Sequence, residues 1–141
     1  MTLSVADRLD ILDVVTRADQ AATDRDADAY VRLFTADAVL DGAQGRHAGR
    51  DALRAAVGPV WAAEGPVTLH LTLNPVIEDL DEDHGRRVAV RSVLLIIGPG
   101  PPVTIRTAAP ITQILVRRNG SWTIDRRTVG APGPPGGEPA A

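Results

Sequence analysis

His70 is the side chain in this sequence best suited to acid–base chemistry. An imidazole ionises near neutral pH, so it can take a proton from carbon or oxygen, provided that a carboxylate orients its second nitrogen. The other histidines, His47 and His84, stand in polar, turn-like segments. The chain has no cysteine, which excludes a thiol nucleophile, a disulfide and a thiolate metal site. No metal-ligand cluster or phosphate-binding loop is visible, so the sequence implies neither a metal nor a cofactor.

A two-residue alternation surrounds His70 and predicts a strand with two different faces. One face holds Leu69, Leu71 and Leu73, and the other holds His70, Thr72 and Asn74. Two interpretations are open. In the first, the leucines face the core and His70 faces solvent. In the second, His70 points into a pocket, and the leucine face is covered by a second copy of the chain in a sheet-to-sheet homodimer.

Helices are expected to precede this strand. Ser4 is suited to cap a helix that runs to about Thr23, and Asp26 is suited to cap a second helix, which carries Tyr30, Leu33 and Phe34. A third helix is predicted over residues 50–63, with Gly58-Pro59 expected to end or kink it because proline lacks the helical N–H.

Strands dominate the second half of the chain. The alternation and the turn signals predict a short strand at 38–41, a glycine loop at 42–49, and strands at 67–74, 86–97, 103–117 and 122–129. Pro110 is expected to break the fourth of these strands, and Asn119-Gly120 predicts a hairpin turn. Helices followed by strands indicate an α+β fold, in which three N-terminal helices cover a curved antiparallel sheet and leave a cone-like pocket.

The composition indicates how the chain is organised and which kinds of molecule it can bind. Residues 1–129 are expected to form one domain, and residues 130–141, rich in Gly, Pro and Ala, a disordered tail. The net charge of −3 is interleaved along the chain, which argues against a nucleic-acid partner. No apolar stretch is long enough for a signal peptide or a membrane span, so a cytoplasmic protein is expected. Because only 3% of residues are aromatic, aliphatic side chains should wall the pocket, which suits a small hydrophobic ligand.

Several segments together resemble the SnoaL-like branch of the nuclear transport factor 2-like superfamily. The resemblance spans roughly residues 9–129 and rests on Asp26-Ala27-Asp28-Ala29-Tyr30, Leu33-Phe34, Asp37-Ala38-Val39, Gly49-Arg50-Asp51-Ala52-Leu53, His70 with Asn74, and Arg117-Arg118-Asn119-Gly120-Ser121-Trp122. It implies a cone-shaped α+β fold, usually dimeric. Its members include polyketide cyclases, scytalone dehydratase, ketosteroid isomerases, a dehydrochlorinase and an epoxide hydrolase, beside non-catalytic binding modules.

The resemblance implies that His70 is a general base and that Asn74, four residues later, contacts the ligand. The position of the family's partner aspartate is occupied by Thr23, which is predicted to contact the ligand, and Asp24 follows it. Asp24 is therefore the predicted partner of His70, with Asp19, one helical turn earlier, as a second candidate. The alternative is that Asp24 belongs to the surface and the caps between two helices.

Other positions match the family only in part. Ala109-Pro110-Ile111 resembles the run before the oxyanion aspartic acid of ketosteroid isomerases, but Thr112 follows it, and the family's oxyanion tyrosine falls at Ala18. This disfavours steroid isomerisation, although the Thr112 hydroxyl can still donate one hydrogen bond to a ligand.

Asp41 and Arg91 complete the predicted site. Asp41 ends a short strand near the place where isomerase-type members carry a base, although an aspartate before glycine is equally a turn residue. Arg91 would need a partner such as Asp24 or Asp41 if it points inward, whereas an edge salt bridge is the alternative. Two functions follow as hypotheses: a cofactor-independent enzyme that transfers protons on a small hydrophobic substrate, or a non-catalytic module that binds a ligand or dimerises.

Overall fold

The computed structural model of the protein describes residues 3–80 and 86–130. Its elements are α1 (Val5–Thr23), α2 (Ala27–Val31), β1 (Phe34–Gly42), β2 (Gly45–Ala48), α3 (Arg50–Ala63), β3 (Leu69–Asp79), β4 (Arg87–Gly98), β5 (Thr104–Arg118) and β6 (Ser121–Val129). The six strands form one sheet in the order β2-β1-β6-β5-β4-β3. The predicted tail lies outside the described residues except for Gly130. Within the described ranges, no helix has the length and apolar character needed to cross a membrane.

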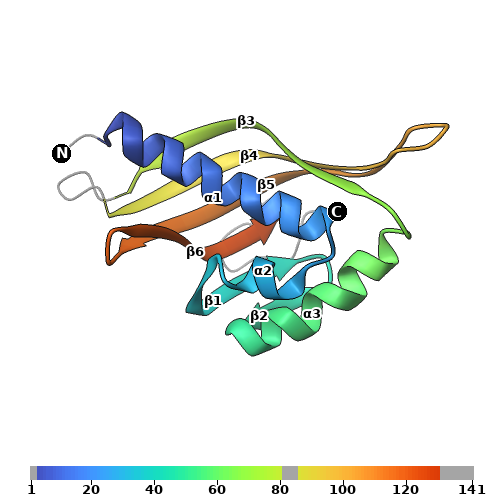
Figure 1. Ribbon diagram of the computed structural model, residues 1–141, viewed down its shortest axis with the longest axis horizontal. Coiled ribbons are helices and arrows are strands. Elements are labelled where there is room, and N and C mark those ends of the chain that lie inside the picture. Colours follow the sequence, from blue (N-terminus) through green and yellow to red (C-terminus); the bar gives the residue numbers. More distant parts are fainter. Residues whose placement is uncertain (1–2, 81–85, 131–141) are drawn as a thin grey trace, which may run out of the picture.

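The predicted α+β class is confirmed. The sheet is curved and unclosed, and Figure 1 shows α1 running along the sheet, with α2 and α3 close to the β1–β2 hairpin. One feature of the prediction is wrong: the sheet is not wholly antiparallel, because β1 and β6 pair in parallel. The backbone N–H of Ile124 donates to the carbonyl of Leu33 at 2.8 Å, just before β1 begins.

The predicted helix starts are confirmed by their caps. The Ser4 hydroxyl accepts from the backbone N–H of Asp7 at 3.0 Å, and the Asp26 carboxylate accepts from that of Ala29 at 2.9 Å. The second helix is shorter than predicted, since Phe34 already pairs with Ile124 in the sheet. Pairing with β6 at the centre of the sheet outweighs the local helical pattern at this residue.

Prolines interrupt these elements less than the sequence predicts. α3 continues through Pro59, because its buried row of Leu53, Val57 and Trp61 holds both sides of the proline against the core. β5 continues through Pro110, which stands opposite Val93 and whose carbonyl accepts from Gly130. The glycine loop also differs from the prediction: residues 45–48 form β2, which pairs with β1.

β3 settles which face of its alternating pattern is inside. Thr68 and His70 are buried, whereas Leu69 and Leu73 are exposed, so His70 points inward as the second interpretation predicts. The strand also runs further than predicted and carries a bulge between Leu73 and Val76. At the bulge Asn74 adopts a left-handed backbone with φ of 54°.

The core lies between the helices and the inner face of the sheet. Its fully buried members come from every layer and include Ile11, Phe34, Leu53, Val88, Leu115 and Ile124. Three of the protein's four aromatic side chains contact one another within the core. The Tyr30 ring centroid lies 4.9 Å from that of Phe34 and 5.4 Å from that of Trp61. These contacts tie the start of β1 to α2 and α3, beside the cavity described next.

Candidate active site

A cavity of about 480 Å³ opens between the helices and the sheet. Its wall is largely aliphatic, as the composition predicts, and polar groups reach it from several elements. The lining residues that could act on a ligand are Tyr30, Gln44, His47, Glu64, His70, Arg106, Thr107 and Arg127. This volume is in the range of ordinary small-molecule sites.

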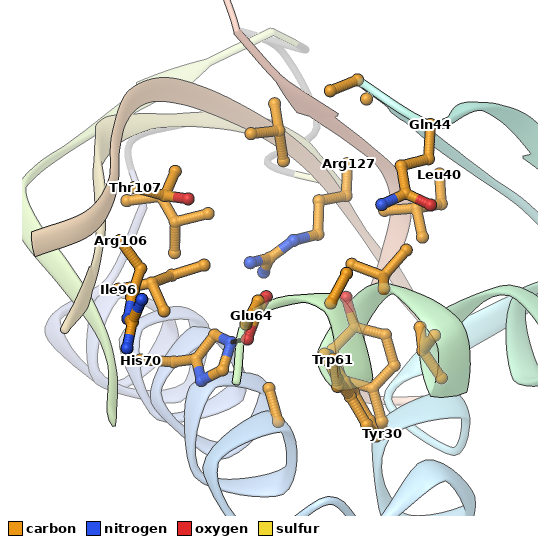
Figure 2. A pocket seen from close by; sticks show the side chains of 18 of the residues that line it. Tyr30, Leu40, Gln44, Trp61, Glu64, His70, Ile96, Arg106, Thr107 and Arg127 are labelled. Carbon is orange, nitrogen blue, oxygen red and sulfur yellow. Dashed lines mark ion pairs between the residues drawn. The ribbon is translucent and has the colours of Figure 1, made fainter. Parts of the chain in front are cut away.

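His70 stands in the wall of this cavity. Its side chain is 3% exposed, and its Nε2 atom lies 2.9 Å from Oε2 of Glu64, as the dashed line in Figure 2 marks. The backbone N–H of His70 donates to the hydroxyl of Thr23 at 3.0 Å, which fixes the strand against the end of α1. Within the described part of the chain, both ring nitrogens of His70 are buried; Nδ1 has no polar partner, and Nε2 meets Glu64 at ion-pair distance without hydrogen-bond geometry. The imidazole therefore meets a carboxylate through Nε2 alone.

Glu64 is placed by the end of α3, for which it is the C-cap. The following residue, Gly65, has φ of 115°, a backbone that glycine adopts readily and that ends the helix. The Glu64 Oε2 atom contacts Arg25 Nη1 and the Thr68 hydroxyl, each at 3.2 Å, in addition to His70. Figure 2 shows the other carboxylate oxygen turned toward the interior of the cavity.

The surroundings of Glu64 set its ionisation. Burial alone would raise the pKa of this carboxyl, but the close contact and charge of His70, with hydrogen bonds from Arg25 and Thr68, outweigh burial and hold the pKa below the ordinary value of 4.5. Glu64 is therefore a carboxylate at neutral pH. Its charge is balanced by Arg25 on the side away from the cavity.

Acidification is expected to weaken the fold through Glu64. A carboxyl whose pKa is lower in the folded chain stabilises the protein fully above its unfolded pKa of 4.5, and this contribution is lost as the pH falls through the lower folded value. The free energy of unfolding, measured by urea titration from neutral pH to about pH 3, should fall more steeply in the wild type than in Glu64→Gln. Glu78→Gln, which removes a more exposed glutamate, should keep the wild-type slope. Parallel curves for wild type and Glu64→Gln would contradict the assigned contacts.

Tyr30 and Arg127 add further polar groups to the cavity. Both side chains point into the cavity in Figure 2. Burial raises the pKa of the Tyr30 phenol, so its O–H stays protonated and can donate to a ligand oxygen. Arg127 is 5% exposed, and its Nη1 donates to Oε1 of Gln113 at 3.2 Å.

The predicted partner of His70 is corrected by this geometry. Asp24 is the C-cap of α1 and is exposed, and Glu64 supplies the carboxylate that His70 contacts. Asp19, the second candidate, is buried and accepts from the Thr72 hydroxyl at 2.6 Å. Thr23, predicted to contact a ligand, bonds the backbone of His70. The capping alternative was thus the correct one for Asp24.

Four other predicted ligand contacts lie outside the cavity wall. Asn74 is exposed at the β3 bulge, and Thr112 faces away from its buried neighbours Ile111 and Gln113. Asp41 contacts Arg126 at 3.3 Å, and the exposed Arg91 pairs with Glu78 across the β3–β4 ladder. Arg91 follows the salt-bridge alternative, because its side chain is 61% exposed.

The sequence analysis missed Glu64, Tyr30 and Arg127 as site residues. Glu64 precedes Gly65-Pro66, a helix-stop signal that could have marked it as a residue at the end of a helix, six positions before His70. Arg126 and Arg127 are consecutive in a strand, so one of the two had to face inward. Tyr30 was treated only as a core residue.

Comparisons with known proteins agree with this architecture. A family model described as the SnoaL-like domain matches residues 3–128. A search of curated proteins returns no match. Among solved structures, a protein of unknown function with a cystatin-like fold from Nostoc punctiforme is 20% identical with a TM-score of 0.84, covering 92% of this chain and 94% of that one.

Two further structures bear names of enzymes. A putative scytalone dehydratase from Novosphingobium aromaticivorans is 19% identical with a TM-score of 0.74, covering 89% of this chain and 83% of that one. The hexachlorocyclohexane dehydrochlorinase LinA-type3 from Novosphingobium barchaimii is 19% identical with a TM-score of 0.76, covering 89% of this chain and 86% of that one. At these identities the likeness concerns the fold.

Proposed function

Because the chain belongs to the SnoaL-like family, we propose that it is a cofactor-independent enzyme that transfers a proton on a small, largely apolar molecule, in a dehydration, isomerisation or cyclisation. The observation that carries the proposal is the His70–Glu64 contact of 2.9 Å in the wall of a cavity whose lining is more apolar than polar. The named functions of the dehydratase and the dehydrochlorinase of similar fold support the same class of chemistry.

In this proposal His70 and Glu64 act as one acid–base unit. The contact of 2.9 Å between Nε2 of His70 and Oε2 of Glu64 occupies that oxygen, so the oxygen turned toward the cavity is the one that a ligand can reach. That oxygen accepts a proton from the ligand and returns it to another carbon or to a leaving hydroxyl. An apolar ligand that displaces water from the cavity strengthens the carboxylate as a base, because burial disfavours its charged form. The Tyr30 O–H can hydrogen-bond the ligand oxygen on which charge develops.

The second candidate function is a module that binds a ligand without catalysis. Thr23 in place of the family's aspartate, and the unpartnered Nδ1 of His70 in the described chain, favour it. Hydrogen exchange separates the two functions. We expect the protein to accelerate replacement of the α-protons of cyclohexanone by deuterium, followed by proton NMR in deuterium oxide. Exchange no faster than with the His70→Ala and Glu64→Gln variants would favour the binding module.

The exposed leucine face supports a homodimer in solution. Leu69, Leu73, Val93 and Ile105 are exposed on the outer face of β3, β4 and β5. Burying such a patch against a second copy removes it from water. Light scattering at micromolar concentration should give twice the chain mass of 14.9 kDa, and Val93→Glu should give the monomer mass.

Leu9→Glu is the matched control, since Leu9 is also exposed but lies on α1, and it should leave the mass of the dimer unchanged. A monomeric wild type at that concentration would contradict the proposed assembly.

A further inference from the structure

Arg127 is a buried cation that enters the cavity and forms no ion pair with any carboxylate of the described residues. Its side chain extends from β6 into the cavity in Figure 2, and its hydrogen bond in the described structure goes to the neutral side chain of Gln113. The neighbouring Arg126, in contrast, pairs with Asp41. None of the ion pairs within residues 3–80 and 86–130 involves Arg127.

Such an arrangement is unfavourable in the empty protein. A guanidinium stays protonated in proteins, so burial cannot be relieved by loss of the charge. Buried charges are normally paired, because desolvation of an uncompensated ion is costly. A ligand that brings a negative group to Arg127 would remove this cost.

The other charged groups of the cavity do not neutralise the positive charge of Arg127. Glu64 already contacts Arg25 and His70 through Oε2. Arg106, an exposed residue of the lining, adds a second positive charge. The rest of the lining is mainly aliphatic and aromatic, with Leu40 and Trp61 among its members. The cavity thus combines an unmatched cation with an apolar wall.

We propose that Arg127 binds a carboxylate of the ligand, so that the substrate is a small carboxylic acid with an apolar body. The planar guanidinium matches a carboxylate in two parallel hydrogen bonds, and Tyr30 can donate a further one. Because Arg127 and Glu64 face the same cavity, an anchored carboxylate would hold the adjacent carbons near the acid–base unit. The catalytic use of this anchor rests on the proposed function, whereas the binding preference does not.

The test compares two probes of nearly the same shape, the anion phenylacetate and the neutral phenylacetamide, by isothermal titration calorimetry on the full chain. We expect the wild type to bind phenylacetate about 10- to 100-fold more tightly than the amide, the usual value of hydrogen bonds to a charged group. Arg127→Gln, which can still hydrogen-bond Gln113, should abolish this preference. Arg126→Gln should keep it, since the neighbouring Arg126 pairs with Asp41 and does not line the cavity.

Three outcomes would overturn the proposal: equal binding of acid and amide, an unchanged preference in Arg127→Gln, or no binding of phenylacetate by the folded wild type. If Arg127→Gln does not fold, Arg127→Lys serves instead, because it keeps the charge but loses the two-pronged geometry and should weaken the preference. If Arg127 served only to hydrogen-bond Gln113 within the fold, its substitution would not change the preference for the acid over the amide. Selective binding of the acid without any proton exchange would leave the anchor intact and contradict only the proposed function.

Discussion

His70→Ala is expected to lower kcat/KM by about 10²- to 10⁴-fold, the usual contribution of a positioned acid–base group. The imidazole is buried against the Glu64 carboxylate, so its removal leaves the base without the side chain that contacts Oε2. Glu64→Gln should have a comparable effect, because an amide cannot accept the proton. The initial rate of α-proton exchange in cyclohexanone, and turnover of the native substrate once it is identified, provide the measurements.

A double variant tests whether His70 and Glu64 act together or independently. If His70 and Glu64 work together, His70→Ala with Glu64→Gln should be no slower than the slower single variant. Asp24→Asn is the matched control, since Asp24 is exposed at the end of α1 and should keep full activity. Loss of activity in Asp24→Asn, with activity retained in Glu64→Gln, would show that Asp24, as predicted from the sequence, is the partner of His70 and that Glu64 is not.

Phe34→Ala is expected to lower the free energy of unfolding by about 3–5 kcal/mol, the usual cost of truncating a buried aromatic ring. Phe34 is fully buried at the start of β1, and its ring contacts Tyr30, which in turn contacts Trp61. The truncation leaves a void that the parallel β1–β6 pairing prevents from closing fully. Urea unfolding at neutral pH measures the loss.

Phe34→Leu keeps most of the apolar volume and should cost much less than the alanine variant. Because Tyr30 and Trp61 line the cavity, Phe34→Ala should also weaken ligand binding, whereas Phe34→Leu should largely preserve it. A loss of less than about 1 kcal/mol in Phe34→Ala would show that this site repacks and that the aromatic contacts do not hold the helices to the sheet.

Much of the fold follows from local patterns. The caps at Ser4 and Asp26 and the Asn119-Gly120 turn are local signals, and each was predicted from neighbouring residues. The parallel pairing of β1 with β6 was not predictable, because it joins segments about 90 residues apart and depends on the curvature of the whole sheet. β2 was missed for a similar reason, since this segment of four residues between glycines forms a strand only through its partner β1.

The site was harder to predict than the fold. The alternation in β3 located His70 but left its direction open, because leucines on one face and polar residues on the other fit either orientation. The carboxylate partner was assigned by counting along α1, whereas Glu64 comes from the end of α3 through a turn at Gly65. No periodicity places a helix end against a strand, since that depends on how two elements pack.

The bulge at Asn74 divides β3 into two parts with opposite inward parity. Before it, the even-numbered Thr68 and His70 face the interior, and after it the odd-numbered Ile77 packs on the core. The extra residue therefore lets one strand present His70 to the cavity and Ile77 to the core. Deletion of one residue at the bulge would force a single parity on the strand and turn one of these two side chains outward.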